Sequence, residues 1–219
     1  MAARVVVDWD GTVTCEDGLV QVLHAFGDPR LLAELEPRVG VDLTLHEEIA
    51  LELASVTAPL EEVVAWVREH VRVRPGFAAF AERHRPTILS SGFGELIEPV
   101  LEREGVTGLE VQANSVQPRP DGWRVRWRDE AQCTACGEAC KRGSLPDGDV
   151  VYVGDGYSDR CAALAAGRVF ARDGLARYLD AEGVAYERFA DFGDVAAALG
   201  AEPGSGAVER PSRSRGRNT

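Results

Sequence analysis

The stretch Val5-Val6-Val7-Asp8-Trp9-Asp10-Gly11-Thr12-Val13-Thr14 decides the fold of this 219-residue chain. Its three consecutive β-branched residues are typical of a strand buried on both faces, as in the centre of a parallel sheet. The strand stops at Asp8 and Asp10, and Gly11 then permits a sharp turn. Ligands of open α/β sheets bind beyond the carboxyl ends of the strands, so both acids are expected at a ligand site.

Asp8 and Asp10 also indicate what kind of ligand to expect. Two carboxylates this close repel each other unless a cation lies between them or one of them is protonated. Mg²⁺ prefers oxygen ligands and is commonly held by one or two carboxylates together with a substrate phosphate. The pair therefore favours an anionic substrate bridged by a metal ion, and the alternative is a turn with two solvated acids.

The composition limits the classes of partner. The chain is 45% hydrophobic with a formal net charge of −12, and its length fits one core domain with a small insert. This acidity disfavours a nucleic-acid or anionic-membrane partner, but it is compatible with a phosphorylated small molecule because a metal ion reverses the local field. No apolar run reaches the length of a membrane span, and the first strand leaves no room for a signal peptide. We therefore expect a cytoplasmic protein with reduced cysteines.

A helical insert follows the first strand. Helical patterns cover residues 17–24, 29–35, 45–56 and 59–70 without an intervening strand pattern. An excursion at this position, directly after the acidic strand end, is suited to act as a lid over the site. The alternative is that it merely covers one side of the sheet.

The remaining patterns alternate between strands and helices, which predicts an α/β fold with a doubly wound parallel sheet. Helices are expected at 77–83, 95–104, 160–166, 175–181 and 192–199. Buried strands are expected at 87–89, 109–113, 150–153 and 169–171, with a hairpin formed by 112–116 and 123–127. Residues 202–219 have no apolar periodicity and are expected to be disordered.

Polar residues follow two further strands, so three strand ends meet at one edge of the predicted sheet. Ser90-Ser91-Gly92 follows the second strand, and Asp155 and Asp159 follow the fourth. Lys141, the only lysine in the chain, lies just ahead of the fourth strand. A serine followed by free backbone N–H groups suits an anion, although Ser90 alone would pass for an ordinary helix cap.

These motifs resemble those of the haloacid dehalogenase superfamily of phosphohydrolases over roughly residues 4–200. Asp8–Thr14 is similar to the first motif, Ser90 to the second, Lys141 to the third and Gly154–Asp159 to the fourth. The resemblance implies a Rossmann-like core of residues 1–14 and 76–201 and a small α-helical cap of residues 15–75. The cap is similar to that of the phosphoserine phosphatase branch, and Cys140-Lys141 is most similar to the methionine-salvage enolphosphate phosphatases.

The resemblance also implies roles for the site residues. Asp8 would be the nucleophile that forms an aspartyl phosphate, and Asp10 the general acid and base. Mg²⁺ would be held by the Asp8 carboxylate, the Asp10 backbone carbonyl and the Asp155 carboxylate. Ser90 and Lys141 would hold the phosphoryl oxygens, where the charge of the transition state spreads. Ser91 and Gly92 are expected to contact the phosphate. The Thr12 hydroxyl would either contact the phosphate or stabilise the turn. Asp159 would orient either Lys141 or a metal-bound water.

The substrate is expected to be a small phosphorylated metabolite, bound by a monomer or homodimer. The segment 40–56 contains no arginine to pair with a carboxylate, while its leucines form an apolar wall or simply the core of the cap. This pattern favours the methylthio substrate of methionine salvage over phosphoserine. Phosphoserine, phosphocholine and phosphoethanolamine phosphatases, a phosphomutase and a non-catalytic metabolite-binding protein stay open as alternatives.

Three cysteines lie close together in the order Cys133-x₂-Cys136-x₃-Cys140. The spacing is similar to that of a zinc knuckle, but a structural zinc needs four ligands and no histidine lies nearby. Cys15 or Cys161 would have to complete the set. We therefore expect reduced thiols near the site and no bound zinc.

Overall fold

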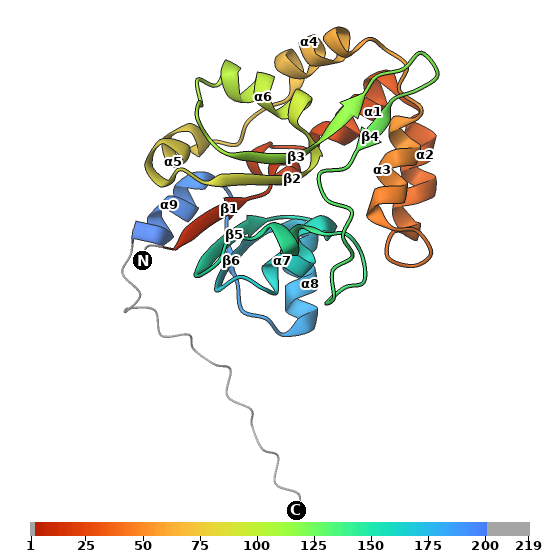
Figure 1. Ribbon diagram of the computed structural model, residues 1–219. Helices are drawn as coiled ribbons and strands as arrows, with labels where there is room; N and C mark the ends of the chain where they lie inside the picture. The colour runs from red at the N-terminus through yellow and green to blue at the C-terminus, as the bar shows by residue number, and fades with distance from the viewer. Residues whose placement is uncertain (1–2, 201–219) are drawn as a thin grey trace, which may run out of the picture.

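The computed structural model describes residues 3–200, and the predicted tail at 202–219 lies outside the described residues. The fold is a mostly parallel seven-stranded sheet with helices on both faces (Figure 1), which confirms the predicted α/β class. The strand order is β4-β3-β2-β1-β5-β6-β7. The strands are β1 (Arg4–Val7), β2 (Thr87–Phe93), β3 (Val111–Gln117), β4 (Arg124–Arg126), β5 (Val150–Gly154), β6 (Arg168–Ala171) and β7 (Glu187–Arg188).

The central strand is β1, which pairs in parallel with β2 on one side and with β5 on the other. The chain first extends the sheet on the β2 side and then returns past β1 to build the β5 side. The carboxyl end of β1 is therefore the switch point at which open α/β sheets bind their ligands. β4 is the antiparallel exception, pairing with β3 at the edge.

Alternate residues of β1 point to opposite faces of the sheet, and each face has its own apolar cluster. Val7 belongs to the larger cluster and Val6 to the smaller one. The larger cluster includes α5 (Phe77–His84), α6 (Gly94–Arg103) and α9 (Phe192–Gly200). The smaller cluster includes α7 (Arg160–Ala163) and α8 (Asp173–Glu182). Both faces are thus covered, as the run of β-branched residues predicted.

The predicted helical insert forms α1 (Gly18–Phe26), α2 (Pro29–Leu35), α3 (Leu45–Leu53) and α4 (Leu60–His70). Asp17 caps α1 by accepting from the Val20 N–H, and Thr44 and Glu47 form a capping box on α3. In Figure 1, α2 and α3 stand beside the carboxyl ends of the strands, while α4 packs on α6. Apolar residues of α1, α3 and α4 belong to the same cluster as those of β1 and β2.

The hairpin of β3 and β4 reaches from the sheet to the helical insert. Trp123 is fully buried, and its Nε1–H donates to the carbonyl of Ala58 at 2.9 Å. Gly122 lies against α3 so closely that a Cβ there, at φ +112°, would be 1.9 Å from the Ala54 carbonyl oxygen. The strand expected at 123–127 is shorter in the structure, Arg124–Arg126. Its first residue, Trp123, is bonded to the helical insert instead.

Several boundaries differ from the sequence prediction. β2 continues to Phe93, with an irregular register after Leu89, so the serines lie within the strand rather than after it. The third strand and the first hairpin strand are one element, β3, and α7 ends at Ala163. β7 was not predicted because it is a two-residue edge strand of charged residues. Within residues 3–200, no helix is both long and apolar enough to cross a membrane.

Candidate active site

The carboxyl ends of β1, β2 and β5 open into a chamber of about 800 Å³ between the sheet and the helical insert. The first turn after β1 brings Asp8 and Asp10 to this chamber, and the turn after β5 brings Asp155. The strand prediction thus placed these acids at the correct edge of the sheet. The residues that line the chamber from β2 and from the turns after β1 and β5 include Asp8, Asp10, Ser90, Ser91, Gly92 and Asp155.

The turn after Asp8 is held from behind by Arg74, which is only 8% exposed. Its guanidinium donates to the carbonyl oxygens of Thr12 at 2.8 Å, Gly11 at 2.8 Å and Thr14 at 3.0 Å. These carbonyls belong to a turn outside any regular ladder and would otherwise be buried without partners. Sequence analysis missed Arg74, because an arginine next to Pro75 in an arginine-rich chain carries no distinguishing signal.

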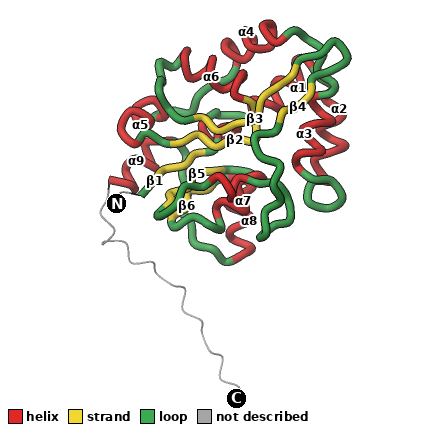
Figure 2. The backbone as a smooth tube through the Cα atoms, viewed as in Figure 1, coloured by secondary structure: helices red, strands yellow, loops and turns green. Residues whose placement is uncertain are grey.

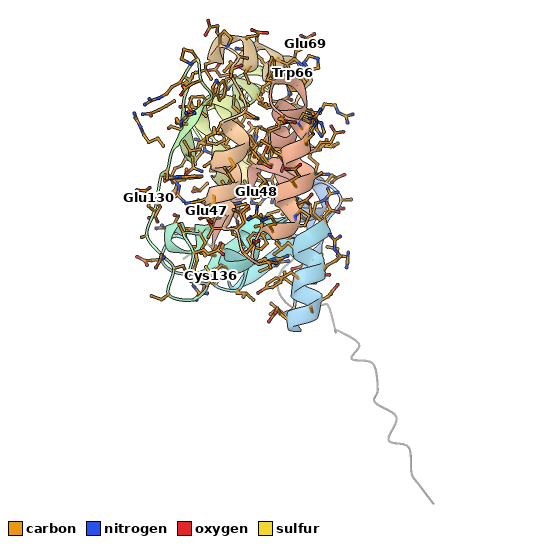
Figure 3. The ribbon with its side chains drawn as sticks, turned by 90° about the vertical axis from the view of Figure 1, so that its right-hand side faces the viewer. Glu47, Glu48, Trp66, Glu69, Glu130 and Cys136 are labelled. Carbon is orange, nitrogen blue, oxygen red and sulfur yellow. The ribbon has the colours of Figure 1, made fainter. Side chains whose placement is uncertain are left out.

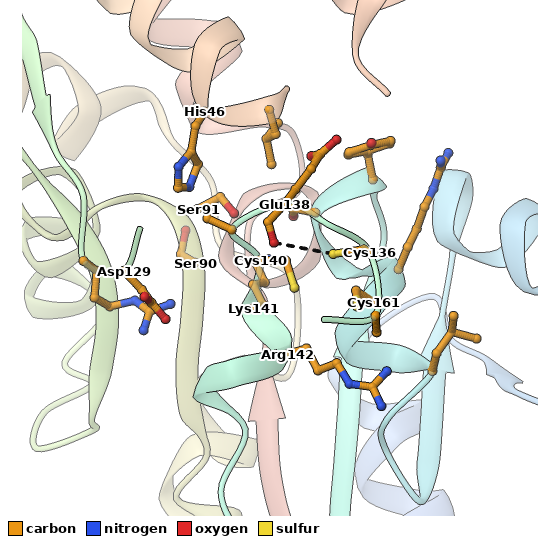
Figure 4. Close-up of a pocket in the computed structure, with 18 of the residues that line it drawn as sticks. His46, Ser90, Ser91, Asp129, Cys136, Glu138, Cys140, Lys141, Arg142 and Cys161 are labelled. Atoms are coloured by element: carbon orange, nitrogen blue, oxygen red, sulfur yellow. Dashed lines mark hydrogen bonds between the residues drawn. The ribbon is translucent and has the colours of Figure 1, made fainter. Parts of the chain in front are cut away.

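Lys141 lies on a short turn, Lys141–Ser144, and is 2% exposed. Its Nζ donates to Asp8 Oδ1 at 2.5 Å and to Asp159 Oδ1 at 2.7 Å. Burial acts to lower the pKa of Lys141, but the charges of Asp159 and Asp8 outweigh it and keep that pKa above its ordinary value. Figure 4 shows Lys141 near Ser90 and Ser91, where a cation can contact an anion bound at the strand ends.

Asp159 is fully buried, and both of its carboxylate oxygens accept hydrogen bonds from other buried or half-buried groups of the protein. Oδ1 accepts from Lys141 and from the Tyr152 hydroxyl at 2.7 Å. Oδ2 accepts from the backbone N–H groups of Asp155 at 2.9 Å and Gly156 at 3.0 Å. Asp159 therefore contacts both Lys141 and the turn that presents Asp155. Tyr152 was not predicted, since it is one residue in a continuous apolar strand.

The carboxylates of Asp8, Asp155 and Asp159 lie within 4.8 Å of one another. Burial raises the pKa of Asp8 and the charge of Asp159 raises it further, while Lys141 lowers it in part. Burial and Asp159 likewise raise the pKa of Asp155 to about 6. Three carboxylates against one ammonium leave an excess of negative charge, which a divalent cation with oxygen ligands would neutralise.

The hydrogen bonds indicate which of these oxygens are free for a metal. Asp159 is fully engaged, and Lys141 takes one oxygen of Asp8. The Thr12 hydroxyl donates to Asp155 Oδ1 at 2.8 Å and is itself fully buried, so it orients Asp155 rather than facing a phosphate. Gly11, at φ +73°, is required because a Cβ there would lie 2.3 Å from Asp155 Oδ2. Asp8 and Asp155 thus fit Mg²⁺ through one remaining oxygen each.

Asp10 lies beside this group and faces the chamber. Its Oδ1 accepts from the Gly18 N–H at 2.9 Å, which ties it to the start of α1. Burial, with the charge of Asp17 in addition, raises the pKa of Asp10 to about 8. At neutral pH the carboxyl group of Asp10 therefore favours its protonated form. A group that donates a proton to a leaving group must be in this form.

The serine segment of β2 lies where the register of the strand is irregular, between Leu89 and Phe93. The Ser90 hydroxyl accepts from the Gly92 N–H at 2.8 Å, and the Ser91 carbonyl accepts from Asn114 Nδ2 at 2.7 Å. Asn114 also accepts from the Arg128 N–H at 3.0 Å, so it joins β2 to the loop that leads to Lys141. Ser90, Ser91 and Gly92 all line the chamber.

The opposite wall of the chamber comes from the helical insert and is acidic. Asp17, Glu36, Glu48 and Glu52 line it, whereas His24 and Arg160 are the basic residues among those lining the chamber. Burial, together with the neighbouring acids, raises the pKa of Glu52 to about 8 and that of Glu48 to about 6. Figure 3 views the molecule from this side and labels Glu48. Sequence analysis did not predict the three glutamates of this wall, because acids in amphipathic helical segments ordinarily face solvent.

The chain is similar to known proteins in sequence and in fold. Residues 5–164 match the model of a family described as haloacid dehalogenase-like hydrolase. The chain is 28% identical over 210 residues to a 2-hydroxy-3-keto-5-methylthiopentenyl-1-phosphate phosphatase of Exiguobacterium sibiricum, covering 89% of this chain and 95% of the relative. It is 27% identical over 207 residues to Pdp3-interacting factor 1 of Schizosaccharomyces pombe, covering 86% and 90%.

A solved structure of a phosphoserine phosphatase from T. onnurineus superimposes with a TM-score of 0.64. The alignment covers 91% of this chain and 94% of that chain at 21% identity. At this identity the likeness concerns the fold alone, and it includes the helical insert as well as the sheet.

Replacing Arg74 by methionine should destabilise the protein, because the carbonyls of Gly11, Thr12 and Thr14 would lose their donors while staying buried. We expect a loss of about 2–4 kcal/mol in the free energy of unfolding, measured by urea denaturation. The control is Arg72→Met, which removes an exposed ion pair with Glu16 and should cost less than about 1 kcal/mol. Equal losses in the two variants would contradict the role given to Arg74.

Proposed function

The chain belongs to the haloacid dehalogenase-like hydrolase family, and on that premise we propose that it is a Mg²⁺-dependent phosphatase of a small phosphorylated metabolite. The observation that carries the proposal is the position of Asp8, at a strand end between Lys141 and the carboxylate of Asp155. The residues 15–75 are proposed to act as its cap, because α1, α2 and α3 supply one wall of the chamber.

The reaction would proceed in two displacements on this chain's own residues. Lys141 orients the Asp8 carboxylate, which attacks the phosphorus and forms an aspartyl phosphate while the ester oxygen leaves. Asp10 gives its proton to that oxygen and later accepts a proton from the water that hydrolyses the intermediate. Ser90 and Lys141 bind phosphoryl oxygens, and Ser91 and Gly92 lie beside them in the wall of the chamber.

A magnesium ion would be held by Asp8 and Asp155, together with the Asp10 backbone carbonyl. When bound, it would neutralise phosphoryl charge and bring the anionic substrate close to the anionic nucleophile. Thr12 and Asp159 act behind these ligands, the first by binding Asp155 and the second by shaping its turn.

For the substrate we place the methionine-salvage enolphosphate first. The activity named for relatives that align over nearly their whole length supports it, as does the apolar part of the chamber wall, Leu32, Val39, Leu45 and Ile49. This compound carries no charge besides its phosphate, and protonated carboxyl groups such as Glu52 would donate hydrogen bonds to its keto and hydroxyl oxygens.

A phosphorylated amine, such as phosphoethanolamine or phosphocholine, is the second candidate. The four carboxyl groups of the cap wall favour it, because a cationic group there would allow them to ionise. Phosphoserine is disfavoured by the same wall, since its carboxylate would face acidic side chains.

Asp8→Asn should abolish turnover, because the amide is a poor nucleophile and cannot form the acyl phosphate. We expect kcat to fall by at least about 10³-fold for Asp8→Asn and by about 10²–10⁴-fold for Asp10→Asn, with an aryl phosphate as substrate. The exposed Asp42→Asn serves as the matched control and should keep full activity. Trapping of labelled phosphate on a residue other than Asp8 would contradict the assignment.

Removal of divalent cations should stop the reaction, and added Mg²⁺ should restore it. Asp155→Asn should weaken Mg²⁺ binding by at least about tenfold, measured by calorimetry and by the Mg²⁺ dependence of the rate. Asp173→Asn alters an exposed carboxylate nearby in the chain and should leave both values unchanged. Full activity of metal-free protein would refute the metal's role.

The substrate candidates separate when kcat/KM is measured for the enolphosphate, phosphoethanolamine, phosphocholine and phosphoserine side by side. We expect the enolphosphate to exceed phosphoserine by at least about tenfold, equivalent to some 1.4 kcal/mol of transition-state binding. An equal or higher value for phosphoserine would overturn the substrate assignment and leave the phosphatase chemistry in place.

Glu52→Gln sharpens this test, because glutamine keeps a hydrogen-bond donor but cannot ionise. With the enolphosphate, kcat/KM should change by less than about threefold, whereas a cationic substrate should lose at least about tenfold. The exposed Glu34→Gln on α2 is the control.

The pKa of Glu52 is raised from 4.5 to about 8, so its contribution to stability is complete below about pH 4.5 and is lost as the pH rises toward 8. Glu52→Gln should therefore stabilise the protein by about 1–3 kcal/mol at pH 8 and hardly at all at pH 4.5.

A further inference from the structure

The three clustered cysteines acquire a fourth partner in the fold. The Sγ atoms of Cys133, Cys136, Cys140 and Cys161 all lie within 4.8 Å of one another. The first three belong to the loop between β4 and β5, and Cys161 belongs to α7 on the other side of that strand. Of the two residues that the sequence left open as a fourth ligand, Cys161 is therefore the one in place, and the ligand shortage that argued against zinc is removed.

The spacing of the sulfur atoms suits a tetrahedral metal rather than a disulfide. A tetrahedral zinc with Zn–S bonds of about 2.3 Å places its sulfurs about 3.8 Å apart. Cys133 Sγ and Cys161 Sγ are 3.7 Å apart, and none of the four thiols is in a disulfide. A disulfide would need a separation of about 2.05 Å.

The loop around Cys133 is already shaped for a thiolate. The Ala135 N–H donates to Cys133 Sγ at 3.4 Å, and the Gly137 N–H donates to the Cys133 carbonyl at 2.8 Å. Gly137 adopts φ +80°, which turns the chain after Cys136 back toward the cluster. Backbone N–H groups directed at sulfur stabilise negative charge on a ligand, which is the usual support around a metal site.

We propose that Cys133, Cys136, Cys140 and Cys161 bind one zinc ion as a structural centre next to the active site. Four thiolates without an open position match a structural zinc, and no oxygen or imidazole ligand is in the set. Iron also accepts four thiolates, but zinc binds more tightly than Fe²⁺ in the general affinity order of divalent metals. The centre is separate from the carboxylate site of Asp8 and Asp155.

The zinc centre joins the two segments that position the catalytic lysine. Cys140 immediately precedes Lys141, and Cys161 follows Asp159 by two residues. Figure 2 shows that the chain between β4 and the Lys141 turn is loop, so no strand or helix ladder holds it in place. A metal that links this loop to α7 would fix the 2.7 Å contact between Lys141 and Asp159.

Figure 4 shows the surroundings of the centre. Cys136, Cys140 and Cys161 border a second cavity, of about 270 Å³, which Lys141 and Ser90 also line. The ion would therefore lie close behind the phosphate-binding residues. Its role is to position Lys141, since none of the cysteines lines the chamber that contains Asp8.

The test is metal content, measured by mass spectrometry on protein purified under reducing conditions without chelator. We expect about one zinc per chain in the wild type, in Cys15→Ser and in Asp155→Asn, and less than about 0.2 in Cys136→Ser and Cys161→Ser. Cobalt grown into the protein in place of zinc should give the intense visible bands of a tetrahedral thiolate site. These readouts do not depend on activity, so they stand apart from the proposed function.

Positioning of Lys141 is tested by rescue at the exposed Cys136. Cys136→His supplies a different zinc ligand and should retain both zinc and kcat, whereas Cys136→Ser should lose zinc and at least about tenfold in kcat. The proposal is overturned by wild-type protein with no metal and five titratable thiols, by iron in place of zinc, or by a disulfide among the four cysteines. It is also overturned if zinc is lost in Asp155→Asn and kept in Cys161→Ser.

Discussion

The buried ammonium of Lys141, held between Asp8 and Asp159, is the interaction on which the rest of the site depends. A buried charge is tolerated only when its partners lie within hydrogen-bond distance, because desolvation otherwise outweighs the attraction. The pairing therefore requires β1 and β5 to be neighbours, α7 to begin next to Asp159 and the loop after β4 to return over the strand ends. The excess of carboxylates that remains is what makes the site suitable for a divalent cation.

A second constraint is the backbone of the turn after β1. The turn leaves carbonyl groups without ladder partners, and Arg74 supplies donors to several of them at once. Arg74 stands at the end of the helical insert, where Thr14 and Val73 also pair across the two connections. The base of the insert is thus bonded to the turn that follows Asp8. The same contacts therefore hold both the turn that positions Asp8 and the insert that forms the chamber wall.

The insert is also held at its far side. Trp123 of the sheet hairpin is buried against it, and the insert shares one apolar cluster with β1 and β2. This double attachment brings the acids of α3 over the anionic strand ends despite their mutual repulsion. Burial, together with the neighbouring acids of the insert, raises the pKa values of Glu48 and Glu52, and this makes the chamber suited to ligands that accept hydrogen bonds or carry positive charge.

The sequence by itself determined the sheet, its central strand and the edge at which Asp8, Asp10, Ser90 and Asp155 meet. These follow from local periodicity and from the rule that parallel strands end at one edge, which needs no knowledge of distant contacts. Only the tertiary structure decided what surrounds them: Arg74 behind the turn, Tyr152 on Asp159, and Thr12 on Asp155. The same holds for Cys161, which completes the thiol group from a helix outside the cysteine-rich loop. Such partners are brought together by the packing of separate elements, and a single sequence carries no periodic signal for a contact between residues far apart in the chain.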